Sequence, residues 1–91
     1  MIEQTVKIVN PSGLHARPAA LFVQTAGKFL SNIWITQGNK RVNAKSIMGL
    51  MSLAIGKGIE VTVGAEGEDE VHAVIELTDL ITSGFKEMDL E

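Results

Sequence analysis

Apolar residues alternate with polar ones in several short segments of this 91-residue chain, and the alternation restricts the fold more than any other feature. It predicts strands with one buried face over 2–9, 32–37 and 59–65, because successive side chains of a strand point to opposite sides of a sheet. Gly38-Asn39 fits a two-residue hairpin turn, which makes 40–43 a short return strand. The predicted inward side chains are Ile33, Ile35, Ile59, Val61 and Val63, and Gln4, Val6 and Ile8 share one side of the half-buried first strand.

Apolar residues three or four positions apart predict two longer helices. The first covers 16–29 and contains Gly27, which costs about 1 kcal/mol relative to Ala inside a helix. The last ends near Gly84, a typical residue just beyond a helix C-terminus. A shorter helix follows Ser46, a good N-cap residue. The predicted buried stripes are Ala19, Phe22, Val23, Ala26 and Phe29 in the first helix, and Val71, Val74, Ile75, Thr78 and Ile81 in the last.

The predicted element order is βαββαβα, and each element has only one apolar side. The economical arrangement is two layers, with three helices on one face of a four-stranded, mostly antiparallel sheet. Trp34 is out of phase with Ile33 and Ile35, so it is expected on the other, open face. The sequence therefore predicts an α+β open-faced β-sandwich built as a single domain over 1–91.

Composition excludes several function classes. The chain has no cysteine, so disulfides and thiolate metal sites are ruled out, and an N-terminus reading MIEQTVKIVN resembles no signal peptide. No apolar run approaches the length of a membrane span, and a cytoplasmic protein is expected. A net charge of −3 argues against a nucleic-acid binder, while seven of the eight basic residues precede residue 58, which suits acidic protein partners. The acids around Glu68 are too uniform and local to indicate a metal site.

His15 lies where the first helix is expected to begin, and this position is the strongest indication of chemistry. Amide groups of a first helical turn have no partner within the helix and attract anions, and Pro18 is tolerated there because it lacks an amide hydrogen. A neutral imidazole nitrogen is a nucleophile, so a phosphoryl group on the ring would meet these amides and the guanidinium of Arg17. From these residues alone, a histidine that merely caps the helix in solvent remains the commoner interpretation.

The helix after Ser46 carries too many apolar residues for one buried face. Leu50 and Leu53 can face the core together, which leaves Ile47, Met48 and Met51 as an exposed apolar ridge suited to docking. An alternative is that the helix packs inward on both sides. Ser46 is also a possible phosphorylation switch, although a simple capping role is the commoner one.

Residues 13–19 (GLHARPA) and 45–53 (KSIMGLMSL) together resemble the HPr family, the histidine-containing phosphocarriers of the bacterial phosphoenolpyruvate–sugar phosphotransferase system. The resemblance extends over 2–84 and implies the same open-faced fold. It implies a carrier and not an enzyme, with no cofactor: His15 accepts a phosphoryl group from enzyme I, Arg17 assists, and the group passes to EIIA components of sugar permeases. The residues implied in docking are Leu14, Ala16, Ala20, Ile47, Met48 and Met51.

The resemblance also implies regulation at Ser46 by HPr kinase/phosphorylase, whose product serves as corepressor for the catabolite control protein in carbon catabolite repression. A monomer is the expected state of such a shuttle. Gly27 stands where relatives often carry a basic residue, so affinity for some partners is expected to differ.

Two alternatives remain at this point. A purely regulatory, Crh-like module would use Ser46 only, but Crh-type relatives lack the histidine that this chain has at position 15. An unrelated α+β RNA-binding domain is disfavoured by the net charge and by the lack of paired aromatics on central strands.

Overall fold

A computed structural model describes residues 1–85, and the last six residues of the predicted domain lie outside this range. The elements are β1 (Ile2–Lys7), α1 (Ala16–Ala26), β2 (Asn32–Gln37), β3 (Lys40–Asn43), α2 (Ile47–Ser52), β4 (Glu60–Glu66) and α3 (Glu70–Thr82). Their order is the predicted βαββαβα. No helix among the described residues is both long enough and apolar enough to cross a bilayer.

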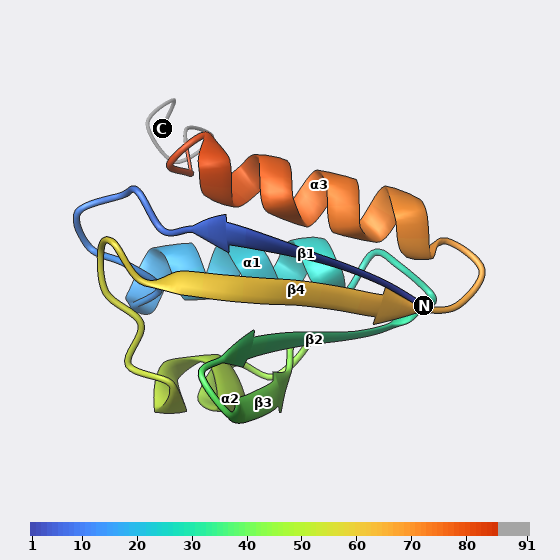
Figure 1. Ribbon diagram of the computed structural model, residues 1–91, viewed down its shortest axis with the longest axis horizontal. Coiled ribbons are helices and arrows are strands. Elements are labelled where there is room, and N and C mark those ends of the chain that lie inside the picture. The colour runs from blue at the N-terminus through green and yellow to red at the C-terminus, as the bar shows by residue number, and fades with distance from the viewer. Residues whose placement is uncertain (86–91) are drawn as a thin grey trace.

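The strands form one sheet in the order β1-β4-β2-β3, and all three neighbouring pairs are antiparallel (Figure 1). β4, the last of these strands in the sequence, lies between β1 and β2 and is mostly buried. The β2–β3 hairpin turns at Gly38 with φ of +63°, and Gln37 pairs with Lys40, so the predicted two-residue turn is confirmed.

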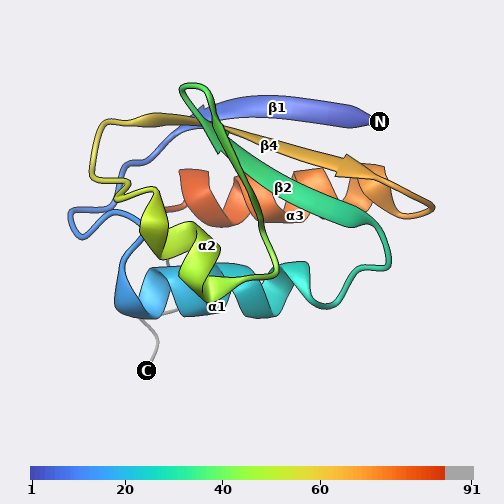
Figure 2. The ribbon, with the colours of Figure 1, turned by 90° about the horizontal axis from the view of Figure 1, so that it is seen from below.

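The helices cover one face of the sheet, and the other face is open (Figure 2). Side chains of β1, β2 and β4 meet those of α1 and α3 in one apolar core whose largest fully buried members include Phe22, Phe85 and Leu77. The predicted open-faced fold is thereby confirmed. On the open face, Trp34 donates from Nε1 to Glu3 (3.1 Å) and lies under the Arg41 guanidinium, 4.7 Å from the ring centroid.

The predicted buried stripe of the last helix is partly wrong. Val71 and Ile75 are about half exposed, at 50% and 49%. The face that packs on the sheet instead consists of Ala73, Val74, Leu77, Thr78, Leu80 and Ile81. The small Ala73 side chain permits close approach to the sheet, a contribution that a pattern of large apolar residues does not reveal.

The first helix is shorter than predicted, because it ends at Ala26 and not at residue 29. Gly27 is its C-cap, with a helical φ of −65°, and the amides of Lys28 and Phe29 bond to carbonyls three residues back. The predicted cost of a glycine inside the helix is therefore wrong. β1 and β4 differ from the predicted ranges by one or two residues, as strand ends commonly do.

Candidate functional site

His15 is the N-cap of α1, in the extended conformation with φ −118° and ψ 153°. Its side chain is exposed and makes no capping hydrogen bond to the helix. Ala16, the first helical residue, has φ of +47°, which an L residue rarely adopts and which costs energy. The imidazole is therefore free at the surface, beside a backbone segment held in an unfavourable conformation.

The first turn of α1 offers amide donors next to the ring. The amides of the first helical residues, Ala16 and Arg17, have no intrahelical acceptor. Pro18 follows with no amide hydrogen and a buried ring, which fills the start of the helix. Arg17 is exposed and carries a permanent positive charge on the same turn. Together with the positive end of the helix dipole, these groups suit an anion bonded to the imidazole.

The loop before His15 is bonded to, and packed against, the segment that follows α2. The Leu14 amide donates to the Ile55 carbonyl (3.0 Å), and both side chains are almost completely buried. Gly13 has φ of +63°, and a Cβ there would lie 2.3 Å from the Ile55 carbonyl oxygen. The Asn10 carbonyl accepts from the Gly13 amide (3.1 Å), which closes the turn predicted at this point. His15 thus stands on a loop bonded to the segment that follows α2.

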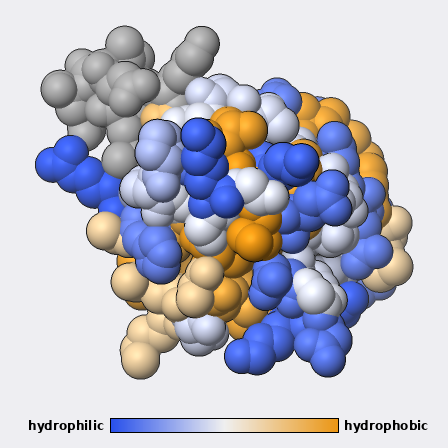
Figure 3. Space-filling model, turned by 60° about the vertical axis from the view of Figure 1, so that its left-hand side comes forward, coloured by the Kyte–Doolittle hydropathy of each residue, from blue (hydrophilic) through white to orange (hydrophobic). Residues whose placement is uncertain are grey.

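An apolar surface adjoins His15, because α1 and α2 pack against each other. Met48 is 81% exposed, while Ile47 and Met51 are 40% and 44% exposed, and Leu50 and Leu53 are buried as expected. Ala16 is exposed and Ala20 half-buried on the neighbouring helix. Figure 3 brings this end forward and shows pale orange, hydrophobic surface at the lower left beside blue, hydrophilic groups. We call the surface of Ala16, Ala20, Ile47, Met48 and Met51 the docking ridge.

Leu14 does not belong to this ridge. Its side chain is fully buried in the core, so the prediction that it lines a docking surface is wrong. Its backbone turns the side chain inward while the amide bonds to Ile55, and only this tertiary contact decides the direction.

Ser46 caps α2, as predicted. Its Oγ accepts from the Gly49 amide (3.1 Å). The preceding Lys45 extends its ammonium to the Phe29 carbonyl beyond the C-terminus of α1 (2.8 Å), so the two helices are bridged beside Ser46. Ser46 is half-buried at the start of the docking ridge.

A family model described as the PTS HPr component phosphorylation site matches residues 2–83. The chain belongs to the HPr family. It is 48% identical over 87 residues to the phosphocarrier protein HPr of Neisseria meningitidis, covering 96% of this chain and 98% of the relative. It is 54% identical over 77 residues to the HPr-like protein Crh of Bacillus subtilis, covering 85% of this chain and 91% of Crh.

The fold of a solved HPr agrees closely with this one. HPr-C-His from Thermoanaerobacter tengcongensis superposes with a TM-score of 0.91 at 60% identity, over 93% of this chain and 96% of that one. The family is therefore shown by sequence and by structure together, over nearly the whole HPr domain.

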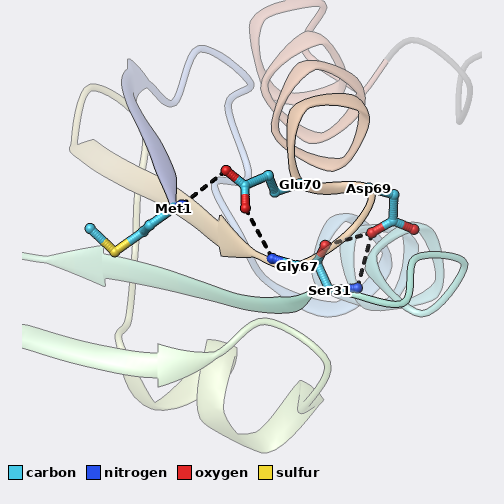
Figure 4. A network of polar contacts seen from close by, with 5 residues as sticks. All are labelled: Met1, Ser31, Gly67, Asp69 and Glu70. Atoms are coloured by element: carbon cyan, nitrogen blue, oxygen red, sulfur yellow. Dashed lines mark hydrogen bonds and ion pairs between the residues drawn. The ribbon is translucent and has the colours of Figure 1, made fainter.

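The end of this HPr-family fold away from His15, where α3 begins, carries a polar network that the sequence did not predict (Figure 4). The Asp69 carboxylate accepts from the Ser31 hydroxyl (2.5 Å) and from the amides of Leu30 (2.8 Å) and Ser31 (3.0 Å). Glu70 accepts from the Gly67 amide (3.0 Å) and pairs with the amino group of Met1 (3.0 Å). The pattern showed only acids at a helix start; the partners of Asp69 come from a loop almost forty residues earlier, and those of Glu70 are the Gly67 amide and the amino terminus.

These bonds favour the charged carboxylates. The Ser31 hydroxyl, followed by the Leu30 amide, lowers the pKa of Asp69 below its ordinary value of 3.8. The Gly67 amide, followed by the amino terminus, lowers the pKa of Glu70 below 4.5. We call this region the Asp69 end and the region of the 10–15 loop the His15 end; they lie at the right and the left of Figure 1.

Proposed function

We propose that this chain is a phosphocarrier that receives a phosphoryl group on His15 from enzyme I and passes it to EIIA components of sugar permeases. The single observation that carries the proposal is the uncapped start of α1, where an exposed imidazole adjoins unpaired amides. Membership of the HPr family supports it. A shuttle of this kind works in the cytoplasm as a monomer and needs no cofactor.

The transfer requires an imidazole nitrogen and a place for three phosphoryl oxygens. The nitrogen lone pair attacks phosphorus, and the nitrogen–phosphorus bond forms while the bond from phosphorus to the donor breaks. Amides of Ala16 and Arg17 then meet the oxygens without reorganising, because the backbone already holds them in place. The Arg17 guanidinium adds charge-assisted hydrogen bonds that stabilise charge on the transferring group. Passage to EIIA reverses these steps, so the chain itself is unchanged.

The docking ridge supports the proposal that several partners use one surface. Methionine side chains adapt their shape, and both Met48 and Met51 are exposed on this surface. The cations of Arg17 and Lys45 at its margins suit acidic partners. A transient carrier needs such an apolar centre with a charged rim more than it needs high affinity.

Ser46 adds a regulatory role to the proposal. Its hydroxyl stands at the N-terminus of α2, beside the docking ridge. Phosphorylation by HPr kinase/phosphorylase would place nearly two negative charges there. The same form would bind the catabolite control protein, in keeping with the similarity to Crh.

Labelling with both phosphoryl donors tests the proposal. Phosphoenolpyruvate and enzyme I should place one acid-labile phosphoryl group on the wild type and none on His15→Ala. ATP and the kinase should give acid-stable label that disappears in Ser46→Ala. Label retained in His15→Ala would contradict the carrier role. Label from ATP and the kinase, without any from phosphoenolpyruvate and enzyme I, would favour the purely regulatory, Crh-like function.

A second experiment tests whether the two sites interact. Ser46→Asp should slow enzyme I-dependent labelling of His15, because the added carboxylate repels an acidic partner surface. Ser46→Ala serves as the matched control, since it removes the cap without adding charge. Equal labelling rates in all three proteins would contradict the coupling.

A further inference from the structure

We propose that Asn10 is a positioning residue for phosphoryl transfer, which holds the Gly13 carbonyl away from α1 and so keeps the Arg17 amide available to the phosphoryl oxygens. The inference rests on the proposed function. Asn10 is 7% exposed and its hydrogen bonds go to Ser12 and Gly13, so its effect on transfer is expected to act through the loop.

The side chain and the backbone of Asn10 both bond to Gly13. Its Nδ2 donates to the Gly13 carbonyl (2.7 Å) and to the Ser12 hydroxyl (3.3 Å), while its own carbonyl accepts from the Gly13 amide. This pair of reciprocal bonds fixes the loop two residues before His15.

The Gly13 carbonyl is the group that would otherwise occupy the anion site. In an α-helix each amide donates to the carbonyl four residues back, so a helix that began one turn earlier would pair the Arg17 amide with Gly13. The structure shows Gly13 with φ of +63° and its carbonyl bonded to Asn10 instead. The Asn10 bond therefore favours the loop conformation in which this amide stays free.

The hydrogen-bonding capacity of the Asn10 side chain is only partly used. Its Oδ1 is buried without a hydrogen-bond partner among the described residues, a condition that is rare and unfavourable. Rotating the amide by half a turn would place Oδ1 against the Gly13 carbonyl, two acceptors together, so the observed orientation is the better one. An apolar residue would avoid the orphaned acceptor, and the donation to Gly13 is what the asparagine adds.

A hollow adjoins the turn of residues 10–13 on the side away from Ile55. It has a volume of about 320 Å³ and is lined by Asn10, Pro11, Pro18, Phe85 and their neighbours. Among the described residues, this hollow adjoins the Asn10 side chain, whose two donated bonds hold the turn from within.

The test compares Asn10→Ala and Asn10→Asp with wild type in enzyme I-dependent phosphorylation. Asn10→Asp preserves shape but has no donor for Gly13 at neutral pH. With either variant as the substrate, the kcat of enzyme I should fall by about tenfold while its KM for the carrier stays within about twofold. The docking ridge is intact in both variants, and only the alignment of the Arg17 amide with the phosphoryl group is lost. In wild type the Arg17 amide resonance should move downfield when His15 is phosphorylated, and this shift should shrink in both variants.

Ser31→Ala is the matched control, since it removes a partly buried hydrogen bond at the Asp69 end. It should lower the melting temperature without changing kcat or the Arg17 shift. Wild-type kcat in Asn10→Ala and Asn10→Asp, or an equal loss in Ser31→Ala, would overturn the inference while leaving the carrier function intact. Failure to label wild type at His15 would instead overturn both.

If neither variant folds, hydrogen exchange in the wild type decides. The Asn10 side-chain amide should exchange slowly because it is buried and bonded. Fast exchange would show that the bond to Gly13 is not maintained in solution and would overturn the inference.

Discussion

At the Asp69 end, the loop amides of Leu30, Ser31 and Gly67 all donate to carboxylates. The Ser31 hydroxyl donates to the Asp69 carboxylate as well. At the His15 end, the start of α1 has no side-chain cap, Ala16 has a positive φ, and a buried amide oxygen of Asn10 has no partner. Both ends lie on the same sheet and the same two long helices. The difference is that backbone amides at the Asp69 end are paired with carboxylates, whereas the first turn of α1 at the His15 end has amides without an intrahelical partner.

The largest effect should come from Gly13→Ala, which acts directly on the His15 end. Its Cβ would lie 2.3 Å from the Ile55 carbonyl oxygen in a left-handed conformation, so the loop must move. Displacing the nucleophile by about 1 Å should slow enzyme I-dependent labelling by about a hundredfold. Gly38→Ala is the control, because Gly38 has the same φ of +63° with nothing within 4 Å of the added atom. Equal slowing in Gly38→Ala would show that the backbone strain, and not the site, is responsible.

Gly67→Ala should break the Asp69 end without affecting transfer. Gly67 has φ of +151°, and its Cβ would meet the Ser31 Oγ at 2.6 Å and Cα at 2.7 Å. We expect the free energy of unfolding to fall by roughly 1–3 kcal/mol in urea titration, with unchanged labelling of the folded protein. Slower labelling in Gly67→Ala would contradict the separation of the two ends.

Gly27→Ala should change the free energy of unfolding by less than about 0.5 kcal/mol, since its added atom makes ordinary contacts.

The smallest effect should appear on acidification. The folded state lowers the pKa of Asp69 and of Glu70, so both carboxylates contribute stability above their ordinary values of 3.8 and 4.5. That contribution should be lost as the pH falls through the lowered values. The melting temperature of wild type should therefore drop more steeply below about pH 4 than that of Asp69→Asn. Parallel curves would show that the Asp69 bonds do not stabilise the fold.

Much of the fold could be predicted because its signals are local. The alternation of Ile33 and Ile35 marked β2 with its observed bounds, the Gly38-Asn39 turn joined it to β3, and Ser46 marked the start of α2. Each of these depends on residues within a few positions of one another. Errors occurred where packing between distant elements decides, as in the half-exposed Val71 and Ile75 of α3.

The candidate site divides in the same way. His15 and Arg17 could be placed at a helix start from sequence, because Pro18 and the apolar spacing mark that boundary. Nothing local indicated that Leu14 points into the core or that Asn10 is buried. A buried asparagine beside a proline in a turn looks like an ordinary solvent-facing turn residue until the surrounding elements cover it.

By itself, the sequence determined the order and type of the elements, the position of His15 at the start of α1 and the apolar helix beside it, because propensity, periodicity and capping act over short distances. The tertiary structure alone decided which amides stay free, which side chains of the loop are buried and how the Asp69 end is joined. Those features arise from contacts such as Leu14 with Ile55 and Ser31 with Asp69, between residues that only folding brings together.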